Sequence, residues 1–184
     1  MSGVSATGQD AGAPPAVRVV DYDARWPSMF EEARAEIVGV CGPALVAVEH
    51  IGSTSVPGLA AKPIIDILAA VVRLEEARHL VGPLAAVGYE YVPEHEAALP
   101  GRRFFRKGRR GAGTHHLHVV ELGGWEWRRQ LLFRDYLRAR PEAVAEYERL
   151  KRHLAAHAAD RGAYTDAKAP FIKSVVEKAL AEGE

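Results

Sequence analysis

The sequence predicts an α+β fold with a mixed β-sheet core flanked by helices and a helical C-terminal segment. Up to residue 123, short strand-like runs alternate with helical patterns, and from residue 124 the pattern is helical throughout. Strands interleaved with helices and then followed by a run of helices are typical of this class. We expect a disordered, Pro- and Gly-rich tail at 1–16 and a single domain at 17–184, with a core at 17–123 and a helical cap at 124–184.

The first half of the core contains the clearest strands. After a β-rich run at 17–20, apolar residues at three- and four-residue spacing predict a helix from Pro27 to about residue 41. A strand follows at 45–51 and leads into the small-residue turn 52–55. The apolar run at 64–72 then has the composition of a strand buried on both faces. Its only charged residue is Asp66.

The elements in the second half of the chain are predicted from the same two kinds of pattern, helical spacing of apolar residues and strand-like apolar runs. A helix is expected at 74–87, stopped by Gly88, and then a strand at 89–92. The segment 102–110 is expected to be a hairpin arm with its turn at Gly108, followed by a strand at 114–121. Helices are expected at 125–140, 141–161 and 164–181, and Pro170 is expected to start a new helical stretch or to kink the last one.

Composition and charge exclude several classes of protein. The chain has 24 Lys and Arg against 24 Asp and Glu, so no general basic excess indicates an extended nucleic-acid footprint or a membrane-surface protein. Its apolar runs are too short to span a bilayer. Cys41 is the only cysteine, which excludes an intrachain disulfide and favours a cytoplasmic location.

The turn at 52–55 and the strand that follows it carry the strongest chemical signal. A strand that ends in Gly52 and Ser53 offers backbone N–H groups and a hydroxyl to a phosphate, because no large side chain blocks the approach. Asp66 then presents a carboxylate where a metal ion bridging that phosphate would sit. The alternative is that the turn is only a turn and that Asp66 forms an ion pair with Lys62 or an arginine.

Two histidines on the strand 114–121 are the next candidates. His116 and His118 are two residues apart, so their imidazoles share one face of the sheet. They are candidates for phosphate contact or general acid–base chemistry, with His118 preferred for catalysis and His116 for phosphate binding. The alternatives are a hydrogen-bonded pair on the sheet face and a transition-metal site completed by Asp66.

The arm at 102–110 concentrates positive charge. It holds six basic residues in nine positions and no acidic residue, interleaved with two phenylalanines. Such a segment is suited to clamp a polyanionic ligand, and Arg103 is our candidate for that contact. The alternative is a solvated edge strand that its charges protect from aggregation.

From residue 17 to about 180 the chain resembles the GrpB family. Four segments carry the resemblance: EHIGSTSVPGLAAKPIIDI (49–67), HHLHV (115–119), LLFRDYLRARP (131–141) and YTDAKAPFI (164–172). This family is assigned to the nucleotidyltransferase-like superfamily and also occurs as a C-terminal extension of some dephospho-CoA kinases. The resemblance therefore implies a nucleotidyltransferase-like core that binds a nucleotide or another phosphorylated small molecule, and a Mg²⁺-dependent nucleotidyltransferase activity is one possible function.

The resemblance also implies roles for particular residues, and one position departs from the pattern. It implies that the Gly-Ser turn, Gly52 and Ser53, holds the phosphates. Thr54 and Lys62 are further candidates for phosphate contact, and so is Lys168 as a point charge within the segment 164–172, for which the alternative is an exposed helix lysine. Asp66 matches the first carboxylate of the superfamily's Asp-x-Asp pattern, but the second carboxylate is replaced by Leu68. Glu121 is the candidate to replace it as a Mg²⁺ ligand. The departure leaves open a one-metal enzyme, altered chemistry, or a non-catalytic binding or scaffold domain.

Overall fold

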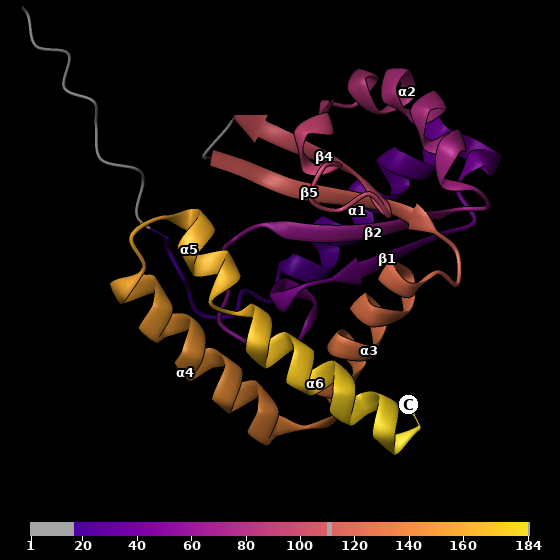
Figure 1. Ribbon diagram of the computed structural model, residues 1–184. Helices are drawn as coiled ribbons and strands as arrows, with labels where there is room; N and C mark the ends of the chain where they lie inside the picture. Colours follow the sequence, from indigo (N-terminus) through magenta and orange to yellow (C-terminus); the bar gives the residue numbers. More distant parts are fainter. Residues whose placement is uncertain (1–16, 110–111, 184) are drawn as a thin grey trace, which may run out of the picture.

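The computed structural model describes residues 17–109 and 112–183, so the tail predicted at 1–16 lies outside the described residues. The described chain forms a five-stranded sheet with the order β1-β2-β5-β4-β3 (Figure 1). The strands are β1 (Ala47–Ile51), β2 (Ile65–Val71), β3 (Tyr89–Tyr91), β4 (Arg102–Arg109) and β5 (Ala112–Glu121). The β2–β5 pair is parallel and the other three pairs are antiparallel, which confirms the predicted mixed sheet.

The helices lie before, between and after these strands. The α-helices are α1 (Trp26–Cys41), α2 (Val81–Ala86), α3 (Trp125–Ala139), α4 (Pro141–His157), α5 (Arg161–Asp166) and α6 (Ala169–Glu182). Short 3₁₀ segments are η1 (Gly42–Ala44), η2 (Ser53–Ser55), η3 (Leu74–Leu80) and η4 (Pro93–His95). In the part of the chain that the structure describes, every helix is too short or too polar to cross a membrane.

The two faces of the sheet are covered by different parts of the chain. On one face α1, η3 and α2 pack against alternate residues of the central strands and form the main core, which includes Trp26, Phe30, Ile37, Leu84, Ile65, Ile67, Leu117 and Val119. On the opposite face α3 covers a smaller cluster formed by Ile51, Leu68 and Val120. The continuous apolar run of β2 is explained by this burial on both sides.

The C-terminal helices form a third cluster of their own. α3, α4 and α6 bury Phe133, Tyr147 and Val176 against one another. Val56 and Leu59, from the segment between η2 and β2, are buried in the same cluster. In Figure 1 α4, α5 and α6 lie together on one side of the sheet, and α3 lies between α6 and β1. The segment that follows the Gly-Ser turn is therefore packed against the helical part of the chain.

Three elements of the structure differ in detail from those predicted from the sequence. The helix expected at 74–87 is 3₁₀ up to Leu80 and restarts as α2, because Pro83 has no N–H to continue the ladder and is tolerated only in a first turn. The helix expected at 164–181 is divided into α5 and α6, and Pro170 lies in the first turn of α6. The run at 17–20 forms only a single bridge, between Val20 and Ala61.

The predicted arm also differs at its turn. Gly108 does not form the turn of the hairpin, since β4 continues to Arg109. Gly108 instead has a positive φ of 96° at a register shift between Lys107 and Gly108. A bulge of this kind favours glycine because the left-handed conformation is strained for other residues. Residues 110–111, between the two strands, lie outside the described residues.

Candidate functional site

The Gly-Ser turn and Asp66 are in close contact. Gly52 has a positive φ of 70°. A Cβ atom placed on Gly52 would lie 2.4 Å from the Asp66 Oδ2 atom. Both the backbone conformation and the close approach of the carboxylate therefore require glycine at this position. The turn and the start of β2 form one compact unit.

Asp66 has a specific partner on the neighbouring parallel strand. The β2–β5 register places Asp66 opposite His116, and its Oδ1 atom lies 3.1 Å from the His116 Nδ1 atom. Burial raises the pKa of Asp66, but the hydrogen bond and the charge of His116, with smaller contributions from His118 and Lys168, lower it more. The net pKa is below its ordinary value, and Asp66 is ionised at neutral pH.

His118 is more deeply buried than His116. Its exposed fraction is 9%, and its Nδ1 atom has no hydrogen-bond partner among the described residues. Burial, followed by the charge of Arg102, lowers the pKa of His118 to about 3, so the ring is neutral. The Phe104 ring lies 5.2 Å from both histidine rings. His116, which is bonded to Asp66, is thus better placed than His118 to exchange a proton.

A cavity of about 830 Å³ opens above this group, between the sheet and the C-terminal helices. Its lining includes most of the residues singled out from the sequence: Gly52, Ser53, Thr54, Lys62, Asp66, His116, His118 and Lys168. The hydroxyl of Thr54 is already engaged, because it donates to the Ile64 carbonyl at 3.3 Å and lies 3.0 Å from His50 Nε2. The Ser53 side chain is hydrogen-bonded to Tyr147, and the Gly52 and Ser53 carbonyls accept bonds from Ser55 and Val56, so the backbone N–H groups of Gly52 and Ser53 are the polar groups that the turn offers to the cavity.

Three lysines gather in this cavity from three segments that are distant in sequence. Lys62 precedes β2, Lys151 belongs to α4 and Lys168 lies between α5 and α6. The Nζ atoms of Lys62 and Lys168 lie 4.3 and 4.5 Å from the centre of the same ring, that of Tyr164. Lys151 is 2% exposed and donates a hydrogen bond to the carbonyl of Ala60.

The environment of these lysines disfavours their charge. Burial, together with the nearby charge of Lys168, lowers the pKa of Lys151 to about 7 and that of Lys62 to about 8. Burial also lowers the pKa of Lys168, an effect that Asp66 opposes. Among the described residues, no carboxylate oxygen lies within 4.0 Å of any of the three ammonium groups. The three ammonium groups therefore have no carboxylate in direct contact among the described residues, and Asp66 and Glu148 act on them only from a greater distance.

The sequence argument missed three of the cavity residues. Lys151 is four residues after the core residue Tyr147, so its place on the buried face of α4 could have been read from helical spacing. Arg102 shares a strand face with Phe104 and lines the cavity, and its buried Nε atom has no partner among the described residues. Tyr164 carried no signal in the sequence, since a tyrosine beside two lysines is recognisable only in three dimensions.

Two predicted site residues lie elsewhere. Arg103 is on the opposite strand face from Arg102, where it pairs with Glu96 at 3.4 Å and donates to the Pro100 carbonyl. Arg103 therefore does not line this cavity. Glu121 pairs in register with Val71, five residues beyond the His116 position, and accepts a bond from the Leu74 N–H. Because side chains alternate along a strand, Glu121 also faces away from Asp66.

The described part of the basic arm, 102–109, does not form a clamp over the cavity. β4 lies between β5 and β3 and is not an edge strand, so the edge-strand alternative is also wrong. Arg106 forms two hydrogen bonds with Glu90 of β3, and Lys107 pairs with Glu36 of α1 at 2.6 Å. These charges connect neighbouring elements. Arg102 is the basic residue of β4 that reaches the cavity.

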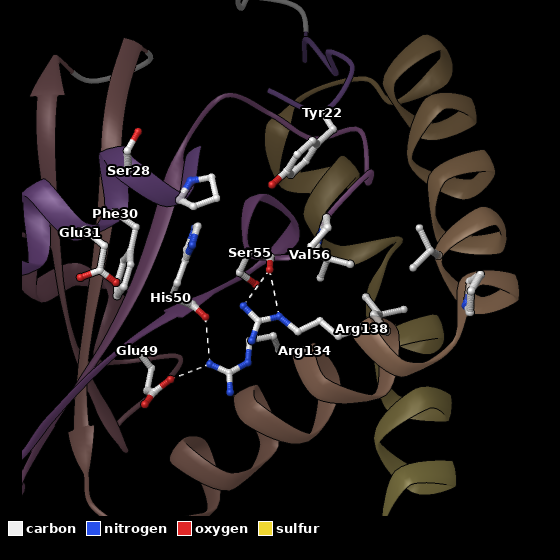
Figure 2. A pocket seen from close by; sticks show the side chains of 15 residues that line it. Tyr22, Ser28, Phe30, Glu31, Glu49, His50, Ser55, Val56, Arg134 and Arg138 are labelled. Atoms are coloured by element: carbon white, nitrogen blue, oxygen red, sulfur yellow. Dashed lines mark hydrogen bonds and ion pairs between the residues drawn. The ribbon is translucent and has the colours of Figure 1, made fainter. Parts of the chain in front are cut away.

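A second cavity, of about 720 Å³, lies beside the same turn (Figure 2). In it Arg138 of α3 donates two hydrogen bonds to the Ser55 carbonyl, at 2.8 and 3.0 Å. Arg134 donates to the Glu49 carboxylate at 2.7 Å and to the His50 carbonyl at 3.1 Å. These bonds fix the end of β1 and the last residue of η2 to α3, as Figure 2 shows.

The donor set does not fit a pair of magnesium ions. Mg²⁺ is held by oxygen ligands, and a two-ion site needs several carboxylates. Position 68 holds a fully buried leucine, and the strand facing Asp66 supplies histidines 116 and 118 in place of a carboxylate. Glu121 does not supply the missing carboxylate, because its side chain points to the other face of the sheet. Among the described residues, no three His, Cys, Asp or Glu side chains are placed to hold a metal ion together.

The comparisons define the class of protein first. The chain is similar to a solved terminal uridylyl transferase from Trypanosoma brucei described with bound dUTP, with a TM-score of 0.51 and 14% identity over 89% of this chain and 55% of that one. The core is therefore nucleotidyltransferase-like. A solved conserved protein GrpB from Enterococcus faecalis is much more similar, with a TM-score of 0.81 and 40% identity over 90% of this chain and 98% of that one.

The family follows from the sequence matches. The family model described as GrpB protein matches residues 16–178, and the chain belongs to this family. UPF0157 protein YqkA from Bacillus subtilis is 42% identical over 89% of this chain, which spans only 47% of that protein. UPF0157 protein SCO7215 from Streptomyces coelicolor is 42% identical over 91% of this chain and 88% of its own length. A dephospho-CoA kinase from Mycolicibacterium paratuberculosis is 32% identical over 94% of this chain and 48% of its own length.

Proposed function

We propose that this chain binds a phosphorylated small molecule, with a nucleotide as the first candidate, in the cavity between the sheet and the C-terminal helices. The observation that carries the proposal is the cluster formed by Lys62, Lys151 and Lys168, in which Lys151 is buried, the other two are half-buried, and none is in direct contact with a carboxylate among the described residues. Isolated buried ammonium groups are costly, and a bound phosphate would supply the missing negative charge.

Three further features support the same ligand. The Gly52–Ser53 turn brings backbone N–H groups to the floor of the cavity. His118 Nδ1 and Arg102 Nε are buried polar atoms without a partner in the described chain, as expected for groups that meet a ligand or water. The cavity volume lies within the range of roughly 300–1,000 Å³ that is usual for small-molecule sites. The nucleotidyltransferase-like fold makes a nucleotide the first ligand to test.

Isothermal titration calorimetry with ATP, CTP, GTP and UTP tests this proposal. We expect at least one of them to bind with a Kd below 1 mM, an affinity worth about 4 kcal/mol or more. Replacing Lys168 with Met should weaken binding by about tenfold or more. The matched control is Lys178→Met, because Lys178 is an exposed lysine of α6 outside the cavity. Equal affinities for the two variants, or no binding by the wild type, would contradict the proposal.

Nucleotidyl transfer is a second candidate function, and the Asp66–His116 pair favours it. A transfer reaction needs a group that accepts the proton of the attacking hydroxyl, and an imidazole held by a carboxylate is suited to do so. His116 would take that proton while the hydroxyl oxygen forms a bond to the α-phosphorus of the nucleotide and the bond from the α-phosphorus to the leaving pyrophosphate breaks. Release of pyrophosphate from a bound nucleoside triphosphate is the measurement, and it should be lost in His116→Gln while nucleotide binding persists. Binding without release by the wild type would leave a non-catalytic binding domain.

A further inference from the structure

The charge arrangement of the cavity differs from that of a site built around metal ions. Carboxylates repel phosphate and need cations between them and the ligand, whereas this cavity brings fixed cations directly to its floor. Lys62 and Lys168 flank the Tyr164 ring from two separate segments, and Lys151 reaches the same cavity from α4. Among the described residues that line the cavity, Asp66 is the one carboxylate from the sheet, and it is already bonded to His116, while Asp166 and Glu177 line the cavity from the C-terminal helices.

Position 68, where the resemblance implies a second metal-binding carboxylate, holds a leucine, and the residue opposite it on the neighbouring strand is a histidine. Leu68 is fully buried beneath α3, in the cluster with Ile51 and Val120. His118, in register with Leu68 on β5, lines the cavity and is neutral, and its imidazole carries nitrogen atoms in place of carboxylate oxygens. Mg²⁺ prefers oxygen ligands, so neither position supports it.

We infer that the lysine cluster takes the place of metal ions in this site, so that the chain binds a polyphosphate as the free anion and without a divalent cation. This inference rests on the proposed phosphate-binding function and specifies the form of the ligand. Each ammonium group acts as a point charge on the phosphate oxygens. Because Mg²⁺ reduces the negative charge of a polyphosphate, the magnesium complex binds less tightly than the free anion.

Calorimetric titrations with inorganic triphosphate and with ATP, at pH 6.5, test the inference. Each ligand is measured in EDTA and again with Mg²⁺ in excess over ligand. We expect binding in EDTA, and an affinity that falls by about threefold or more with Mg²⁺. Binding that requires Mg²⁺, or that Mg²⁺ strengthens, would overturn the inference and leave the proposed phosphate site intact. No binding in either arm would overturn the proposed function and this inference together.

Two variants separate a role in binding from a role in folding. Lys168→Met should weaken triphosphate binding in EDTA by about tenfold or more, while Lys178→Met should leave it unchanged. Lys62→Met gives a second, independent test if Lys168→Met fails to fold, as judged by circular dichroism. His116→Asp places a second carboxylate beside Asp66 and should make binding stronger with Mg²⁺ than in EDTA. Unchanged affinity in folded Lys168→Met and Lys62→Met proteins would overturn the inference.

Discussion

Two structural constraints, one on the backbone and one from a neighbouring side chain, each require glycine at position 52. Its backbone is left-handed, with φ of 70°, and its α-carbon lies against the carboxylate of Asp66. A side chain there would be strained and would also displace the acid that holds His116. Gly58 shares only the first requirement, since it has φ of 77° but open space around it. Substitutions at these two positions therefore distinguish the effect of backbone strain from the effect of contact with Asp66.

The first prediction compares alanine at these two positions. Gly58→Ala should cost on the order of 1 kcal/mol of unfolding free energy, from left-handed strain alone. Gly52→Ala should cost about 1–3 kcal/mol more, because its Cβ overlaps Asp66. Urea denaturation measures both values. Equal losses for the two variants would contradict the close approach of Asp66 to the turn.

The second prediction concerns Lys151 and pH. Burial lowers its pKa to about 7, whereas a lysine in the unfolded chain has a pKa near 10.5. Between these values the unfolded chain binds more protons than the folded one, so this lysine makes the free energy of unfolding rise with pH. The destabilisation of the folded state by the buried charge of Lys151 is fully present below about pH 7 and decreases as pH rises toward 10.

Urea unfolding in phosphate-free buffers at pH 7 and pH 9 checks this expectation. The wild type should gain stability at pH 9 relative to pH 7, and Lys151→Met should gain less. Lys62 contributes in the same direction, because its pKa is lowered to about 8. The same gain in the wild type and in Lys151→Met would show that Lys151 titrates as an ordinary surface lysine.

Among the elements, α3 does the most to position the turn. Its Arg134 and Arg138 donate to carbonyl oxygens at both ends of the segment 50–55. On the same helix, Trp127 and Leu131 pack on the buried cluster beneath the sheet. One helix thus fixes the turn by hydrogen bonds and covers Leu68 by packing.

The third prediction tests this helix through Arg134. Arg134→Met should cost about 1–3 kcal/mol of unfolding free energy, because the His50 carbonyl and the Glu49 carboxylate lose a buried charged donor. Arg128→Met is the matched control, since Arg128 lies exposed on the same helix and should change stability by about 0.5 kcal/mol or less. Chemical denaturation of the two variants measures the difference. A similar cost for both would contradict the role of Arg134 in holding the turn.

The elements also show what the sequence could predict. β2 was identifiable because burial on both faces leaves an almost unbroken apolar run, and the break between α5 and α6 follows from Pro170. The side-chain alternation of β4 separated Arg102 from Arg103, but nothing in the sequence tells which strand face meets a cavity. The sheet order that puts His116 beside Asp66 depends on long-range pairing, and the lysine cluster depends on how α4 and α5 pack. These parts of the site could not be predicted from local patterns.

At the scale of the whole molecule, the cavity joins the sheet to the C-terminal helices. Lys62, Asp66 and His116 come from the sheet and its loop, whereas Lys151, Tyr164 and Lys168 come from the helices. α4 also holds the loop before β2, because Glu148 accepts a bond from the Ala60 N–H at 3.2 Å and Lys151 donates to the Ala60 carbonyl. A bound ligand would contact both halves at once.

The fourth prediction follows from this shared cavity. A ligand that binds only the folded state at 100 times its Kd adds about 2.7 kcal/mol of stability. For a chain of this size, that gain corresponds to a rise in Tm of about 5–10 °C. Differential scanning calorimetry in EDTA, with the tightest-binding nucleotide, measures the rise. At the same ligand concentration the rise should be much smaller in Lys168→Met, and a full-sized rise there would place the ligand elsewhere.

The cavity is lined by residues from early and late parts of the sequence, and this affects when the site can form during protein synthesis. Ser53 and Asp66 leave the ribosome early, while Lys151 and Lys168 are added late, after the whole sheet has been synthesised. A nascent chain that already contains all five strands has the turn and the aspartate but lacks two of the three cations. Under the proposed function, ligand capture would therefore be deferred until translation has passed α5. An unfinished chain would then not sequester the ligand, and the ligand would stabilise only chains in which the helices have docked.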